Sequence, residues 1–400
     1  MVKGMKDAFV RVKDKNDYYD YNLLAVVILL TCFGLVMLYS TTAYMAELQF
    51  DGNDMYYFSK QAIISAVCIV IAIGVSFLDY HILHKLSGFI LFTSIVLMVL
   101  VQSPLGVTVY GARRWLNLGI RFQPSEIAKI AAITYIPVII IKMGKQFKGL
   151  KACMIPLGVG AILFLSAYIF TDNLSTAIII MGIVCIIVFV AHPKTLPFLW
   201  VALGGILFLG IGIAVLHMTM EVSDSFRLQR ILVWLEPEKY SEKGGYQILQ
   251  ALYALGSGGL FGKGLGNSIQ KLGQLPEAQN DMIFSIVCEE LGIFGAGIVI
   301  VLFGYLIYRL YFIARNASDL YGSLMVAGVM GHISIQVIFN LCVVLNIFPT
   351  TGITLPFISY GGTSILFIML EMALVLSVSR QIKIKKIETN LWGEVIEYSS

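Results

Sequence analysis

Charged residues are scarce in this sequence. Asp, Glu, Lys and Arg together make up 13% of its 400 residues, whereas soluble globular domains carry about 25%. Hydrophobic residues make up 58%, and the mean hydropathy is +0.84. This composition excludes a soluble globular domain and predicts an integral membrane protein, with no nucleic acid among its partners.

Residue patterns typical of disulfide frameworks and metal centres are also missing. Of the six cysteines, five fall in apolar runs, Cys153 lies at the edge of one, and none forms a C-x-x-C pair. Among the five histidines only His81 and His84 are near each other, and such a pair is more typical of a solvated helix end. The sequence therefore predicts no disulfide framework, no metal site and no cofactor.

Long apolar runs are abundant, and each can cross a hydrocarbon core about 30 Å thick. The expected fold is all-α, a polytopic membrane protein with about ten transmembrane helices and a large extracellular loop between helices 7 and 8. The sequence contains no repeats or linkers that would divide it. We predict a cytoplasmic segment 1–22, one membrane domain 23–378 that contains the extracellular loop 217–280, and a cytoplasmic tail 379–400. The ten predicted spans are 23–39, 62–78, 86–101, 127–141, 154–170, 174–191, 196–216, 282–308, 324–345 and 365–378.

The distribution of Lys and Arg predicts that both termini are cytoplasmic. In that orientation 17 of these residues lie in cytoplasmic segments and ten outside, and Lys129 lies within a span. Nine of the ten outer charges fall in two loops, 102–123 and 217–280, against the positive-inside tendency. We interpret these two loops, with the outer segment 346–364, as the working face.

The acidic stretch "LPEAQNDMIFSIVCEELG", residues 275–292, concentrates four carboxylates. Pro276 suits the first position of a helix, on which Glu277, Asp281 and Glu289 would share one face. An ionised acid in the middle of a membrane is costly, so Glu289 and Glu290 should face a partner. They are expected to form structural ion pairs or bonds to loop backbone, whereas Asp281 at the outer mouth is the candidate functional residue.

A basic stretch, "GARRWLNLGIRFQPSEIAK", covers residues 111–129. A helix beginning at Pro124 beside Arg113 and Arg121 would favour an anion, because free N–H groups and guanidinium groups both bind phosphate oxygens. The alternative is a Glu126–Lys129 ion pair with arginines reaching lipid headgroups. Asp172, in a short outer turn, is a second candidate partner for Lys129.

Two further outer segments are rich in glycine. In "GSGGLFGKGLGNS" Ser257 and Gly264 stand where a P-loop needs Gly and Ser or Thr, so a tight loop is predicted instead of a nucleotide site. The segment "NIFPTTGITLPFISYGGTS" contains Ser359, and irregular backbone at membrane depth must be buried or line a cavity. Glu371, in the last span, has no evident partner in the sequence.

Taken in order, five stretches resemble the SEDS family of shape, elongation, division and sporulation proteins, which includes FtsW, RodA and SpoVE. They are "GARRWLNLG", "QPSEIAK", "GGYQILQALYALGSGGLFGKGLGNS", "LPEAQNDMIFSIVCEELG" and "GITLPFISYGGTS". The segment "GLGNSIQKLGQLPEA" resembles the FtsW and SpoVE branch more than RodA. The chain departs from the family in "NDM", where Thr-Asp-Phe is usual, and at Thr354 and Lys60.

The resemblance implies a glycosyltransferase that polymerises lipid II into glycan strands at the outer face of the bacterial cytoplasmic membrane. Partners would be a class B penicillin-binding protein and other division proteins, and the location would be the septum or the forming spore wall. The family's essential aspartate falls on Asp281, which we predict to be the general base. The predicted substrate-binding residues are Arg113, Trp115, Arg121, Glu126, Lys129, Arg230, Glu277 and Ser359, and Asp172, Glu289 and Glu290 are assigned to a charge network.

Two alternatives remain open at the level of sequence. A lipid II flippase would need a similar headgroup site and intramembrane charges, for which Glu289, Glu290 and Glu371 are candidates. A non-catalytic scaffold of a division complex would not need Asp281 at all.

Overall fold

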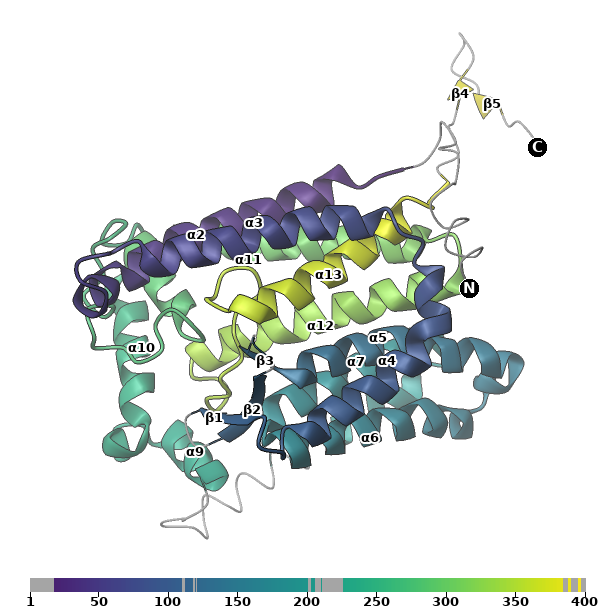
Figure 1. Ribbon diagram of the computed structural model, residues 1–400, viewed down its shortest axis with the longest axis horizontal. Helices are drawn as coiled ribbons and strands as arrows, with labels where there is room; N and C mark the ends of the chain where they lie inside the picture. Colours follow the sequence, from purple (N-terminus) through teal and green to yellow (C-terminus); the bar gives the residue numbers. More distant parts are fainter. Residues whose placement is uncertain are drawn as a thin grey trace.

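The computed structural model describes residues 18–109, 112–117, 119, 121–200, 203–205, 210, 226–383, 388–389 and 395–396. Most of the described chain is helical, and the long helices run side by side along one axis (Figure 1). They are α2 (Tyr21–Gln49), α3 (Tyr56–Ser76), α4 (His81–Leu100), α5 (Pro124–Met143), α6 (Met154–Thr171), α7 (Leu174–Ala191), α11 (Ile283–Asn316), α12 (Leu320–Val344) and α13 (Gly362–Ser379).

Within the described ranges, nine helices are long and apolar enough to cross a membrane. Each coincides with one predicted span, so this part of the prediction is confirmed. The predicted span 196–216 lies mostly outside the described residues, although residues 196–200 and 203–205 are helical. Many of the side chains that the spans expose on the outer surface of the bundle are large and apolar, as expected for a membrane protein.

The two ends of the bundle differ. At one end, which we call the terminal end, Asp20 before α2 bonds Arg309 of α11, and Ser377 of α13 bonds the Leu78 carbonyl. The other end, which we call the loop end, bears the two short helices α9 (Phe226–Leu235) and α10 (Gly245–Ser257), drawn away from the main bundle in Figure 1. The prediction places the loop end outside the cell.

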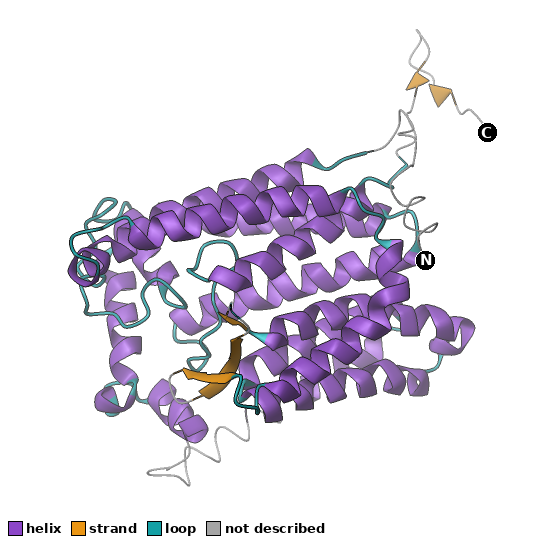
Figure 2. Ribbon diagram, viewed as in Figure 1, coloured by secondary structure: helices purple, strands orange, loops and turns teal. Residues whose placement is uncertain are grey.

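A small sheet lies at the loop end and was not predicted from the sequence. Strands β1 (Gly106–Val109), β2 (Ala112–Asn117) and β3 (Arg121–Phe122) pair antiparallel in the order β1-β2-β3 (Figure 2). The described residues also include the short 3-10 helices Gly144–Lys148, Leu150–Cys153 and Ser241–Lys243 and the two-residue strands Glu388–Thr389 and Val395–Ile396. The last strand of the β1–β3 sheet ends at Phe122, and α5 begins two residues later at Pro124.

Local sequence explains several helix starts. The side chains of Asp20, Asn173 and Asp319 each accept a hydrogen bond from a backbone N–H in the first turn of the helix that follows. These caps satisfy donors that have no partner within the helix. Tight packing between α7 and α12 uses Gly328 and Gly331, where an added Cβ would come within 2.9 Å of isoleucine side chains of α7.

Residues 275–282 form turns, so the expectation that a helix begins at Pro276 is wrong. The helix α11 begins at Ile283, and Glu277 has a left-handed backbone with φ of 56°. A stripe of acids along one continuous helix therefore does not exist. Four-residue spacing alone did not reveal the turn, because the spacing is also compatible with consecutive turns.

The helix α11 is interrupted at Gly292, whose φ and ψ are 65° and −162°. Backbone groups released by the interruption are bonded by the glycine-rich loop: the N–H groups of Lys263 and Gly264 donate to the carbonyls of Glu289 and Glu290, both at 2.9 Å. A Cβ on Gly262 would lie 2.1 Å from the Glu290 carbonyl oxygen. The glycines therefore allow two backbones to touch, which agrees with the predicted tight loop.

The segment 353–360 dips between the helices. Leu355, Phe357 and Ile358 are buried, and a Cβ on Gly34 of α2 would lie 2.6 Å from the Ile358 Cα. This irregular backbone is therefore enclosed by protein, as predicted for a non-helical segment at membrane depth.

Candidate active site

Asp281 lies at the end of a turn that is fastened to its surroundings on two sides. The Asn340 side chain of α12 donates from Nδ2 to the carbonyls of Asp281 and Ile353, both at 2.8 Å. Ser359 Oγ donates to the Asn280 carbonyl at 2.6 Å, and the Tyr360 N–H donates to the Gln279 carbonyl at 2.9 Å. The backbone that presents Asp281 is thus held by segments about 60 to 80 positions away.

Asp281 as a whole residue is 8% exposed, and within the described part of the chain its Oδ1 atom has no hydrogen-bond partner. Burial, with a smaller contribution from the nearby Glu277 carboxylate, raises the pKa of Asp281 to about 7. Arg230 acts in the opposite direction on this pKa. A carboxylate with these properties can accept a proton near neutral pH, which is what a general base requires.

Two of the predicted substrate-binding residues modulate this carboxylate. Glu277 accepts a short hydrogen bond from the Asn280 side chain, one residue before Asp281. Arg230, on α9, donates from Nη1 to the Thr350 carbonyl at 3.1 Å. The short helix α9 therefore brings a cation toward the aspartate from a segment about 50 residues upstream.

The residues of the basic stretch occupy different environments. Arg121, on β3, is exposed, and none of the described residues forms a hydrogen bond or ion pair with its side chain. Trp115, on β2, is half-buried and pairs with Val107 of β1. Arg113 donates to the carbonyls of Gln102, Ser103 and Gly106 at 3.2, 2.6 and 3.4 Å. Its guanidinium holds the loop before β1, which explains its presence without a phosphate ligand.

Lys129 is 2% exposed and lies within a buried chain of polar groups. Its Nζ atom is 2.9 Å from Glu126 Oε1 and 3.0 Å from His332 Nε2, and His332 Nδ1 is 2.7 Å from Glu371 Oε2. Because a protonated lysine only donates, Nε2 accepts and the imidazole proton lies on Nδ1, facing Glu371. The chain thus joins α5, α12 and α13.

These contacts correct two expectations. Asp172 is exposed, its carbonyl accepts a bond from Arg114 at 3.2 Å, and it is not a partner of the Lys129 ammonium. Glu371, which had no evident partner in the sequence, bonds His332. Sequence reasoning missed His332, although an ionisable residue inside a predicted span was a signal that could have identified it.

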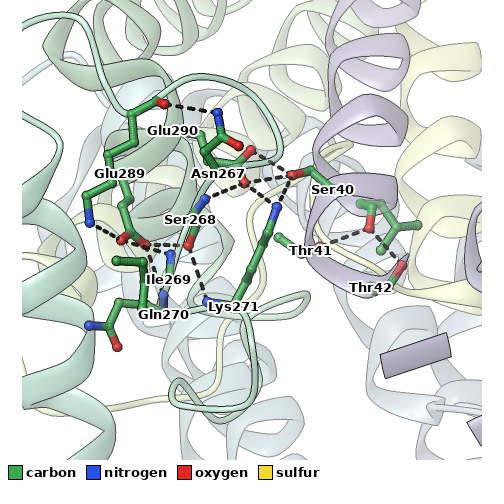
Figure 3. Close-up of polar contacts among 12 residues, drawn as sticks. Ser40, Thr41, Thr42, Asn267, Ser268, Ile269, Gln270, Lys271, Glu289 and Glu290 are labelled. Carbon is green, nitrogen blue, oxygen red and sulfur yellow. Dashed lines mark hydrogen bonds and ion pairs between the residues drawn. The ribbon is translucent and has the colours of Figure 1, made fainter. Parts of the chain in front are cut away.

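Glu289 and Glu290 are fully buried and have several partners each (Figure 3). Glu289 pairs with Lys263 at 2.7 Å and also accepts bonds from Ser268 and from the N–H groups of residues 269 and 270. Glu290 pairs with Lys271 at 2.7 Å and accepts a bond from Ser40 of α2 at 2.7 Å. The interpretation of both glutamates as structural ion pairs with bonds to loop backbone is confirmed.

The comparisons with known proteins agree with this fold. The family model of the FtsW, RodA and SpoVE proteins, described as "Cell cycle protein", matches residues 20–384. The "Probable peptidoglycan glycosyltransferase FtsW" of Trichlorobacter lovleyi is 36% identical over 370 residues, which are 92% of this chain and 94% of that protein. The "Stage V sporulation protein E" of Bacillus subtilis is 36% identical over 366 residues, 90% of this chain and 97% of that protein.

Two solved structures share the fold at lower identity. One is described as "Structural coordination of polymerization and crosslinking by a peptidoglycan synthase complex", with a TM-score of 0.73 and 24% identity over 90% of this chain and 98% of that chain. The other is the rod shape determining protein RodA of Thermus thermophilus, with a TM-score of 0.60 and 24% identity over 92% of this chain and 98% of that chain. The resemblance drawn from the sequence motifs is confirmed, and the chain belongs to the FtsW, RodA and SpoVE family of membrane proteins.

Proposed function

We propose that this protein is a peptidoglycan glycosyltransferase that polymerises lipid II, with Asp281 as its general base. Relatives with high coverage are named as peptidoglycan glycosyltransferases. The single observation that supports the assignment of Asp281 is its buried, unpartnered carboxylate oxygen, in a group whose pKa is raised to about 7.

In the proposed reaction Asp281 removes the proton of the acceptor sugar's 4-hydroxyl group. The oxygen then forms a bond to the anomeric carbon of the donor, while the bond from that carbon to the undecaprenyl pyrophosphate breaks. The leaving pyrophosphate takes the bonding electron pair, and the proton on Asp281 is afterwards released to solvent. A correctly placed general base of this kind contributes roughly 10² to 10⁴ in rate.

The leaving group needs positive charge, and the site offers it from two elements. Arg121 is exposed on β3, two residues before Gln123 and the start of α5, where backbone N–H groups favour an anion. Arg230 approaches Asp281 from α9. We assign these two arginines to the pyrophosphate, and Trp115 and Ser359 to shaping the site around them. Arg113 is left out because loop carbonyls bind its guanidinium.

Glu126 and Lys129 serve the site from within the bundle in this proposal. Their ion pair, with His332 beside it, places a buried cation and a buried carboxylate in fixed positions near the start of α5. No metal or cofactor takes part in the proposed reaction.

The proposed setting follows from the family and from the charge distribution. The loop end faces the outside of the cytoplasmic membrane, both termini are cytoplasmic, and the enzyme works at the division septum or the spore wall. A class B penicillin-binding protein is the proposed partner, since one similar fold comes from a structure described as a peptidoglycan synthase complex.

Polymerisation of purified lipid II in detergent tests the proposal, with and without a class B penicillin-binding protein. The Asp281→Asn variant should lose at least about 10²-fold in rate while remaining folded and keeping its binding to the partner. The matched control is Asp51→Asn, which changes an exposed aspartate in the connection between α2 and α3 at the same end. Polymerisation by Asp281→Asn at a rate close to that of the wild type would exclude Asp281 as the base.

One observation favours a second candidate, a lipid II flippase. The buried chain from Glu126 through Lys129 and His332 to Glu371 is the type of intramembrane charge cluster that transporters use. The same detergent assay separates the two functions, because a flippase has no membrane to work across there and would form no polymer. Complementation of a deletion strain by Asp281→Asn would instead favour a scaffold.

A further inference from the structure

Residues 258–272, which we call the glycine-rich loop, have an inverted distribution of polar and apolar side chains. Its exposed large side chains are all apolar: Phe261 is 76% exposed, and Leu260, Leu265, Ile269 and Leu272 are exposed as well. A loop in water normally presents polar groups and avoids such a patch.

Both lysines of the loop and Ser268 contact the buried glutamates of α11, whereas Asn267 is exposed. Ser268 and Lys271 point toward Glu289 and Glu290 (Figure 3). The Nζ atoms of Lys263 and Lys271 each lie 2.7 Å from a carboxylate oxygen, of Glu289 and Glu290 respectively. The loop contains no other charged residue. Its outward face therefore has no charge, and its two charges are neutralised inside.

Backbone groups of the loop also form hydrogen bonds with the backbone of α11. Besides the bonds from Lys263 and Gly264 to α11, the Ile293 N–H donates to the Gly259 carbonyl at 3.1 Å and the Phe294 N–H donates to the Leu260 carbonyl at 3.3 Å. Non-helical backbone enters a hydrocarbon region only when its polar groups are satisfied in this way.

The depth of the loop is inferred from two contacts between α2 and α11. Asp20 bonds Arg309 at the terminal end, and Ser40 bonds Glu290 toward the loop end. The two contacts are separated by 20 residues along α2 and by 19 residues along α11. At about 1.5 Å per residue the 20 residues along α2 span about 30 Å, which matches the thickness of a hydrocarbon core. On this length the Glu290 contact would lie near the membrane boundary at the loop end.

The apolar side of the loop continues the lipid-facing surface of α11 inward from that boundary. The Phe261 ring stacks on the Phe294 ring with centroids 5.1 Å apart and planes at 15°. Phe294 is 61% exposed, and the same outer surface of α11 includes Ile293, Ile298 and Val301. Phe294 is four residues past Glu290 along α11, on the side of Glu290 that leads toward Arg309 and the terminal end.

We infer that the glycine-rich loop is embedded in the leaflet at the loop end, where acyl chains cover Leu260, Phe261 and Leu265. The sequence alone predicted a tight extracellular loop and did not place it relative to the bilayer. Lipid is the occupant that the structure favours, because the patch is continuous with the surface that a membrane-spanning helix already presents to acyl chains.

Cysteine labelling of the purified full-length chain in proteoliposomes tests this inference. The Phe261→Cys and Leu265→Cys variants alter exposed side chains, so the fold should be preserved. A charged maleimide, which stays in water, is applied, and peptide mapping by mass spectrometry separates the new thiols from the six native ones. The controls are Asn53→Cys, in the exposed connection between α2 and α3, and Val301→Cys, on the lipid-facing surface of α11.

Both loop variants should react at least about tenfold more slowly than Asn53→Cys and about as slowly as Val301→Cys, because the reactive thiolate needs water. Unfolding in a strong detergent should make the four rates equal. Reaction of the loop thiols at the rate of Asn53→Cys would overturn the inference. So would protection that occurs only when a class B penicillin-binding protein is present, since the patch would then be a protein-binding surface.

Discussion

Replacing Glu277 by Gln should move the acidic limb of the polymerisation pH profile to lower pH. The pKa of Asp281 is raised from 3.8 to about 7, first by burial and second by the negative charge of Glu277. A difference of about 3 pKa units corresponds to about 4 kcal/mol in favour of the protonated form. Removing the negative charge of Glu277 makes the Asp281 carboxylate easier to form, so its pKa falls.

The size of the shift follows from the ranking of the causes. Burial is the larger cause and is unchanged in the variant, so the acidic limb should move to lower pH but stay above the ordinary pKa of an aspartate, 3.8. Gln can still accept the hydrogen bond from Asn280, so the turn should be preserved.

The assay is the initial rate of lipid II polymerisation between about pH 5 and pH 9, analysed as kcat/KM because this ratio reports groups of the free enzyme. Glu236→Gln is the matched control, since Glu236 pairs with Lys239 near α9 and does not contribute to the pKa of Asp281. Its acidic limb should coincide with that of the wild type. An unchanged limb in Glu277→Gln, or one moved to higher pH, would refute the electrostatic argument.

Three further predictions concern stability, measured as the thermal unfolding temperature of purified protein in detergent. Asp281→Asn should raise this temperature above about pH 7 and have little effect near pH 4, because the raised pKa makes the folded wild type lose stability as pH rises from 3.8 to about 7; equal shifts at both pH values would contradict it. Gly262→Ala should lower the free energy of unfolding by at least about 2 kcal/mol, because the φ of Gly262, 76°, is left-handed and an alanine Cβ there would meet the Glu290 carbonyl. The control Gly256→Ala should be tolerated, because no atom lies within 4 Å of the added Cβ. Lys271→Met should cost about 3 to 5 kcal/mol by leaving the buried Glu290 charge without its ion pair, and adding Glu290→Gln should recover a large part of the loss; no recovery in the double variant would argue against unpaired charge as the cause.

Hydropathy was sufficient to find the nine described spans because a membrane imposes the same length and polarity on each of them. The pairing of Glu289 and Glu290 was predictable for a related reason. A buried acid in a membrane protein needs a partner, so the need could be predicted even though Lys263 and Lys271 could not be named.

The geometry of the site could not be predicted in the same way, because its contacts join distant segments. His332 is 203 positions from Lys129, and the bond that holds Asp281 comes from Asn340, 59 positions away. Arg113 resembled an anion-binding residue by its charge, but a guanidinium also satisfies backbone carbonyls in a loop. Its sequence neighbourhood is the same in both cases, so only the fold distinguishes them.

Three of the four acids in residues 275–292 illustrate how burial can be used for opposite purposes. Glu289 and Glu290 are fully buried with lysine partners, and their hydrogen bonds join the glycine-rich loop to α11 and α2. Asp281 is nearly as buried, but the groups that hold it bond its backbone carbonyl and leave a carboxylate oxygen without a partner. A lysine beside Asp281 would stabilise the carboxylate and lower its pKa away from neutrality. The fold therefore fixes the position of Asp281 through its backbone and keeps its side chain ready to exchange a proton, while the ion pairs on α11 secure the loop beside it.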